Sequence, residues 1–305
     1  MANAVFSPKD FKAWIIEETT TGNAGGGTPS APAITASMFQ LDVDSVSFPS
    51  FNMNQVLNVR SQSGRVQHKS DFFQDNDIRT TELSLSGKWH NDAGHGMLLQ
   101  SVAGAALAGA AADVSVGTAA TTKAGKYGEE ESEKTFTLVL APPDGTDGNN
   151  IIIVGGLCTN FALSADMGTD GGEYKWSATI SSGRVPQLGN AQTAAGTAYG
   201  ATTVDMSGID VSETKIVSVS SPILSSFGVT IDSPAIYTGV AEGAGYACFG
   251  RGSEISITAN ATVKYDAATR GLVNTFAGGT NQPVDEADLF TINQTTPTAT
   301  SITIP

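Results

Sequence analysis

Residues 78–106 read IRTTELSLSGKWHNDAGHGMLLQSVAGAA, and this stretch contains the clearest local order in the chain. Its first half alternates, with Leu83, Leu85 and Gly87 on one side and polar residues between them. A period of two is typical of a β-strand with one buried and one hydrated face. The stretch therefore predicts a strand that opens at Ile78 and ends near Trp89.

The second half of the same stretch changes to the spacing of a helix. Asn91 or Asp92 can cap a helix N-terminus, and apolar residues then recur at helical spacing at Met97, Leu98, Val102 and Ala105. We expect a helix near residues 92–103. Because the rest of the chain is rich in predicted strands, this helix must pack against a sheet or a sandwich.

Composition limits the class of protein. The chain has 305 residues, of which 40% are hydrophobic, so it can build one large β domain or two smaller ones. It contains 34 glycines and only 15% charged residues, which suits many turns and a surface that is buried against copies of the same chain. The net charge of −14 and the pI near 4.5 argue against binding nucleic acid by phosphate neutralisation. They are compatible with an acidic wall that repels passing DNA.

Two sequence features bear on the cellular compartment. Cys158 and Cys248 are too few for a disulfide scaffold, and we expect two buried thiols, although one bridge between them remains possible. Residues 1–14 lack the apolar core of a signal peptide, and no apolar run is long enough to span a bilayer. We therefore expect synthesis in the cytoplasm and no membrane association.

The chain divides into four segments by composition. Residues 1–34 hold a predicted helix over 9–18 and a flexible polar arm, and residues 35–188 form the first part of a β-sandwich. Residues 189–203 are a connector rich in Gly, Ala and Thr, and residues 204–305 close the sandwich as part of the same domain.

Short alternating or apolar runs predict ten to twelve strands. Two of the clearest strands begin at Met38 and at Val56. The others are predicted over residues 136–140, 151–154, 161–166, 174–181, 216–219, 227–232, 254–264 and 300–304. A second helix is expected over residues 267–276. The form Phe-x-aliphatic-polar-apolar-Asp occurs at Phe39, Phe161 and Phe227, which is compatible either with a true internal repeat or with chance alternation. This pattern predicts a mainly β fold, a sandwich or barrel with short flanking helices.

Two charged segments are candidates for contacts between subunits. Residues 60–77 are either a long solvated hairpin or loop, or an extension that docks on a neighbour. The candidate contact residues are Arg60, Arg65, Lys69, Asp71, Phe72, Phe73, Asp75, Asp77 and Arg79. A second, acidic run is either a solvated edge or part of the wall or rim of a channel, and it consists of Glu129, Glu130, Glu131 and Glu133.

The sequence shows no pattern that indicates catalysis. It lacks a P-loop and a nucleophile elbow. His90, Asp92 and His95 have metal-binding side chains, but their spacing matches no zinc motif, which favours a role in the cap and turn. Asp166, Asp170 and Glu173 surround two glycines without the calcium-loop pattern, so we interpret them as a hairpin turn. We expect no enzymatic activity, no cofactor and no metal.

The order of these segments resembles the tail tube proteins of long-tailed bacteriophages. The resemblance begins at Glu18-Thr-Thr-Thr-Gly22 and continues through Leu83-Ser-Leu-Ser-Gly87 and the helix from Gly96. It extends over the predicted hairpin of residues 161–178, the strands at residues 227 and 255–260, the helix near Leu272, and Ser301-Ile-Thr-Ile-Pro305. The alanine-rich stretch after Gly104 and the connector near Gly189 depart from the family pattern.

The resemblance implies a structural virion protein with the β-sandwich of the tail-tube type. Its subunits would form rings, commonly hexameric, that stack into a hollow tube and guide DNA from capsid to host. The implied partners are copies of the chain, other tail proteins (tape measure, tail terminator, and baseplate or tip) and passing double-stranded DNA that is not bound specifically. The implied location is the virion tail, after assembly in the host cytoplasm.

Two other classes are compatible with parts of the sequence. A capsid decoration protein, or another virion surface protein, would also be an acidic β-sandwich without catalytic residues. A polysaccharide-active enzyme on a β scaffold would need clustered carboxylates and aromatic residues. The three tryptophans, Trp14, Trp89 and Trp176, are instead scattered along the chain.

Overall fold

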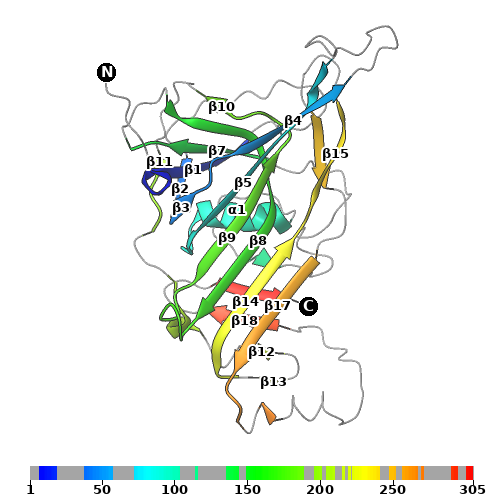
Figure 1. Ribbon diagram of the computed structural model, residues 1–305. Helices are drawn as coiled ribbons and strands as arrows, with labels where there is room; N and C mark the ends of the chain where they lie inside the picture. Colours follow the sequence, from blue (N-terminus) through cyan, green and yellow to red (C-terminus); the bar gives the residue numbers. More distant parts are fainter. Residues whose placement is uncertain are drawn as a thin grey trace, which may run out of the picture.

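The computed structural model describes sixteen ranges of the chain and leaves the residues between them aside. These ranges are 7–18, 38–57, 72–103, 114–115, 135–143, 149–188, 196–200, 204–209, 215–216, 219–220, 222–240, 247–251, 256–266, 269–270, 290–294 and 300–304. Within them the fold is mainly β, as the sequence predicts (Figure 1).

The described elements are nineteen strands, two short 3₁₀ helices (Pro8–Asp10 and Met206–Gly208) and one α-helix, α1 (Ala93–Ala103). The strands are β1 (Lys12–Glu17), β2 (Met38–Leu41), β3 (Ser45–Val46), β4 (Ser50–Leu57), β5 (Phe72–Lys88), β6 (Val114–Ser115), β7 (Phe136–Ala141), β8 (Ile151–Asp166), β9 (Lys175–Ser182), β10 (Gln187–Leu188), β11 (Gly196–Thr197), β12 (Lys215–Ile216), β13 (Val219–Ser220), β14 (Leu224–Asp232), β15 (Ala235–Val240), β16 (Ala247–Arg251), β17 (Ser256–Val263), β18 (Phe290–Gln294) and β19 (Thr300–Ile304).

Strand β8 connects two layers of one twelve-stranded sheet. Its first half pairs with β7 and β10, and β7 continues through β1 and β2 to β11; we call this the first layer. Its second half pairs with β9 on one side and β14 on the other. The second layer therefore has the order β17-β14-β8-β9-β5, with β3 and β4 on the far side of β5 (Figure 1).

Two smaller sheets complete the described strands. One has the order β13-β12-β18-β19-β6, and the other is the pair β15-β16. The terminal strand β19 covers the predicted residues 300–304.

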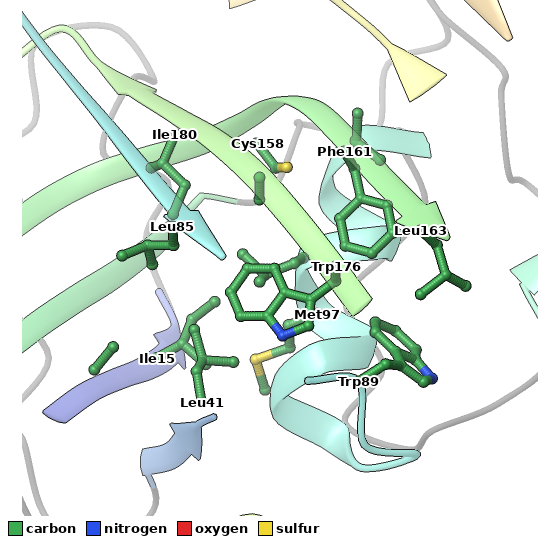
Figure 2. Packing of buried hydrophobic residues seen from close by; sticks show 14 of the residues in the cluster. Ile15, Leu41, Leu85, Trp89, Met97, Cys158, Phe161, Leu163, Trp176 and Ile180 are labelled. Carbon is green, nitrogen blue, oxygen red and sulfur yellow. The ribbon is translucent and has the colours of Figure 1, made fainter. Parts of the chain in front are cut away.

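Both layers and α1 contribute to one hydrophobic core. Figure 2 shows Trp176 of β9 in the middle of this core, beside Met97 of α1. Asp92 caps α1 through its backbone and side chain, because Gly96 N donates to its carbonyl oxygen at 3.0 Å and His95 N to Oδ1 at 3.0 Å. Met97, Leu98 and Val102 are buried against the strands, so the predicted helix and its packing against a sheet are confirmed.

The predicted helix over residues 9–18 is wrong. Ser7 caps a single 3₁₀ turn, and the chain then continues as β1 between β2 and β7. Ala13 and Ile15 lie in the main core, whereas Trp14 lies in a second apolar cluster on the other face of the first layer. A strand that is buried on both faces does not alternate between apolar and polar residues. The apolar residues of β1 therefore also fit the spacing of a helix.

The strands predicted over residues 151–154 and 161–166 form one strand of sixteen residues, β8. The glycines between them mark a bend and not a chain break. Gly155 adopts φ 68°, and a Cβ on Gly156 would lie 2.8 Å from the ring of Phe136. The strand count exceeds the predicted ten to twelve because many short pairings, such as β10 and β11, lack a pattern of their own.

Several predictions on chain organisation stay predictions. The boundaries at residues 34, 188 and 203 are not tested, although β10 and β11, on either side of the connector, pair with β8 and β2 of the same sheet. Most of the helix expected over residues 267–276 lies outside the described residues. The echoes at Phe161 and Phe227 lie in adjacent antiparallel strands, β8 and β14, which neither requires nor excludes duplication.

Glu18 is a buried carboxylate at the end of β1, beside the bend of β8. It accepts hydrogen bonds from Thr137 Oγ1 at 2.7 Å, from Gly155 N at 2.8 Å and from Thr135 Oγ1. We expect Glu18→Gln to lower the free energy of unfolding by about 1–3 kcal/mol, because an amide group would face three donors with one acceptor oxygen. Urea unfolding followed by circular dichroism measures the loss. The matched control is Glu17→Gln, and equal losses in both variants would contradict the assignment.

Candidate assembly surface

The outer face of the second layer is lined by small, mostly hydroxyl-bearing side chains. In β5, β9 and β14 the residues facing the core are apolar and buried, and those between them are half-buried or exposed. We call the outer residues the hydroxyl face: Ser84, Ser86, Asn160, Ala162, Ser164, Ser177, Thr179, Ser226, Gly228, Thr230, Ser256, Thr258, Asn260 and Thr262.

The strand register places these residues in rows that cross the whole layer. The central row contains five uncharged small residues and runs over Ser86, Ser177, Ala162, Thr230 and Thr258. The pair Asn160 and Asp232 lies in the row on one side, and the pair Lys88 and Lys175 in the row on the other. Charged residues therefore flank the central row on both sides, and Glu82 and Asp166 lie one row further out.

The two lysines at one end are neutralised by neighbouring carboxylates. Lys88 Nζ lies 2.9 Å from Glu173 Oε2, and Lys175 Nζ lies 2.6 Å from Asp170 Oδ1. These hydrogen bonds raise the pKa of each lysine above its ordinary value. Glu173 and Asp170 are thus engaged by lysines, and Asp166 accepts from Gly168 N at 2.7 Å, as expected for a hairpin turn.

The second layer ends in two strands without charged residues. β17 has the sequence SITANATV and, among the described strands, pairs only with β14. β4 has the sequence SFNMNQVL and pairs only with β5 within the described part of the chain. Soluble proteins usually protect such edges with lysine, proline or a bulge. β17 is thus an uncharged edge of eight residues that is suited to pairing with another strand, whereas β4 lies beside residues 72–82 of β5 and its ladder shifts register between Met53 and Asn54.

The candidate contact segment is partly a two-stranded ribbon. The pairing of β5 with β9 starts at Thr81, whereas its pairing with β4 reaches back to Phe72, so the ribbon of β4 and β5 extends beyond β9 (Figure 1). The predicted strand start at Ile78 is wrong, because β5 begins at Phe72. A strand that pairs with one neighbour is held by backbone hydrogen bonds and needs no alternation of apolar side chains. The polar residues 74–77 therefore show no strand pattern in the sequence.

The ribbon contains five of the candidate contact residues. Phe72, Phe73, Asp75 and Arg79 pair with β4, and Asp77 lies at the register shift between Asp75 and Arg79. The other four, Arg60, Arg65, Lys69 and Asp71, lie outside the described residues, as do Glu129, Glu130, Glu131 and Glu133. Contact with a neighbour and an acidic wall therefore stay predictions.

An exposed apolar rim lies at the other end of the second layer, and the sequence interpretation missed it. Met167, Ile223 and Tyr265 are 51%, 48% and 66% exposed. They follow or precede three adjacent strands, since Met167 N donates to Ser225 O and Lys264 N to Ile223 O. Each residue lies just outside a strand, where the sequence has no periodicity, so only the sheet register brings them together.

The possible metal and thiol residues occupy packed positions. His90 and His95 are buried, and each lies 2.8 Å from a carboxylate oxygen, of Asp42 and Asp92 respectively. Within the described ranges, no cluster of three or more His, Cys, Asp or Glu has a metal-binding arrangement. The buried Cys158 is a thiol that donates to Asn160 O at 3.3 Å, as expected, and it is not bridged to Cys248.

No known protein family model and no curated protein matches this chain. Among the described residues, no helix combines the length and apolarity needed to cross a membrane.

Proposed function

We propose that this chain is a structural virion protein that polymerises as stacked rings into the hollow tail tube of a long-tailed bacteriophage. The observation that carries the proposal is the second layer, which ends in the uncharged strand β17 on one side and in the short uncharged strand β3 beside β5 on the other. Pairing β17 of one copy with the β3 side of the next extends the sheet from subunit to subunit, and such a head-to-tail contact closes into a ring when the rotation allows it.

The hydroxyl face supports the second part of the proposal, the passage of DNA. This face points away from the core in which α1 is packed. Its central row carries no charge, and the lysines at its end are paired with carboxylates. DNA binding without sequence preference depends on cations that replace counterions at phosphates. A tube lined by this face therefore offers DNA little to adhere to.

The two ends of the layer support ring stacking. The ribbon of β4 and β5 projects at one end, and the apolar rim of Met167, Ile223 and Tyr265 lies at the other. Exposed apolar groups of this kind are typical of contact surfaces. In the stack, each ring presents the ribbon to one neighbour and the rim to the other, and other tail proteins contact the end rings.

Electron microscopy of the purified full-length chain tests the proposal. We expect tubes of regular bore, built from rings, whose length increases with protein concentration. Monomers or isolated trimers that never polymerise would overturn it. Trimers that bind preformed capsid shells would instead assign the chain to the decoration proteins.

A further inference from the structure

Two buried histidines lie side by side between the end of β2 and the start of α1, which are adjacent in space. The proposed assembly does not use them. His90 and His95 are 2% and 0% exposed, and their ring centroids lie 5.4 Å apart. Both contact Asp42, which follows β2: His90 through the carboxylate and His95 through the backbone amide. Buried ionisable side chains at such a junction make its structure sensitive to protonation.

A backbone donor determines the protonation state of His95. Asp42 N donates to His95 Nε2 at 3.3 Å, and an amide N–H can only donate, so Nε2 carries the lone pair. Nδ1 then holds the single ring proton and donates to Asp92 Oδ1 at 2.8 Å. Burial alone would raise the pKa of Asp92, but the hydrogen bonds that its carboxylate accepts from the ring and the backbone amide of His95 hold that pKa below its ordinary value. His95 is therefore neutral and its partner ionised.

His90 has a different arrangement. Its Nε2 lies 2.8 Å from Asp42 Oδ2 and donates to that carboxylate. A second proton on His90 would leave this hydrogen bond in place and turn it into an ion pair. A second proton on His95 would instead place an N–H directly opposite the N–H of Asp42. Only His95 loses its contact with Asp42 on protonation.

We propose that His95 is a pH-sensitive latch between Asp42 and the first turn of α1, which acidification opens. A proton from solvent adds to Nε2, and the Asp42 amide loses its acceptor. The carbonyl oxygen of Asp42 packs against Gly87 of β5, 2.0 Å from the position of an ideal Cβ, so the latch also holds the contact between this loop and β5. The proposal is independent of the assembly proposal.

Several ionisable groups face the latch. Asp92 lies at the cap of α1, 2.8 Å from His95 Nδ1, and the carboxylate of Asp42 interacts with Lys88. The ring centroid of His90 lies 5.4 Å from that of His95, and the ring centroid of Tyr199 lies 4.9 Å from that of His90.

Hydrogen exchange of the Asp42 amide tests the latch. Peptide-level exchange is compared between the wild-type chain and His95→Gln at pH 8 and pH 5, the range in which histidine changes its charge. The side-chain oxygen of glutamine can still accept from Asp42 but cannot be protonated. We expect equal exchange at pH 8 and about tenfold faster exchange in the wild type at pH 5, which corresponds to the loss of one hydrogen bond.

His90→Gln is the matched control and should keep the wild-type acceleration. The same wild-type to His95→Gln ratio at both pH values would overturn the latch. If His95→Gln does not fold, ¹⁵N shifts of the wild-type imidazoles provide the second measurement. A bare Nε2 on His95 at pH 8 that becomes protonated at pH 5, together with faster exchange of Asp42, supports the latch. A protonated Nε2 at pH 8 overturns it.

Discussion

Replacing Trp176 with alanine is expected to lower the free energy of unfolding by about 3–5 kcal/mol. Trp176 is the largest fully buried side chain of the described residues. Its ring packs edge-on against His95 at 5.5 Å between centroids, and its Nε1 donates to Lys88 O at 2.9 Å. The substitution opens a cavity between β9 and α1 and leaves the Lys88 carbonyl without this donor (Figure 2). Urea unfolding at neutral pH measures the change.

Two variants of β9 separate packing from other effects. Trp176→Phe keeps an aromatic ring and loses the Nε1 donor, so we expect an intermediate loss of about 1–3 kcal/mol. Ser177→Ala changes the exposed neighbour on the hydroxyl face and should stay within about 0.5 kcal/mol of the wild type. A loss below about 1 kcal/mol for Trp176→Ala would show that this core is not organised around β9.

Replacing Ala259 with lysine is expected to abolish polymerisation while leaving the folded subunit intact. Ala259 is exposed in the middle of β17, on the side of the strand away from the hydroxyl face. A lysine in an edge strand opposes the addition of another strand, because its charge would be buried in the new contact. Electron microscopy and sedimentation velocity measure assembly, and circular dichroism verifies that the variant is folded.

Thr230→Lys is the matched control for the edge. Thr230 pairs with Thr258 of β17 but lies one strand further inside, on β14, so the same charge is added without blocking the edge. This control should still form rings and tubes. Tubes formed by Ala259→Lys as readily as by the wild type would exclude β17 as the subunit contact. A wild-type chain that forms no tubes would refute the tube itself, so the two failures are distinguishable.

Local patterns in the sequence predicted much of the second layer. The alternation around Leu83 and Leu85 reflects a strand with one buried face, and the same holds for β9 and β14. The cap at Asp92 and the apolar spacing after it located α1 to within a residue at its start. A few neighbouring residues are enough to predict these elements. Burial of one face repeats apolar residues with the period of the helix or strand.

The first layer shows where this reasoning fails. β1 is covered on both faces, so Ala13, Trp14 and Ile15 carry no polar alternation and were assigned to a helix. β8 passes through a glycine bend that looks like a loop in the sequence. Both errors arise because the conformation of these residues depends on pairing and packing with segments that are distant in the chain.

The candidate surface divides in the same way. The sequence by itself determined that a strand around Leu83 and Leu85 is followed by a helix near residues 92–103, and that Ser84 and Ser86 face away from the core. Only the tertiary structure decided that five strands align these small side chains into one face, that β17 lies at one edge of this face within bounds that contain no charged residue, and that His95 contacts Asp42. The physical reason is that period and capping are local properties, whereas strand order and register depend on pairing between distant segments.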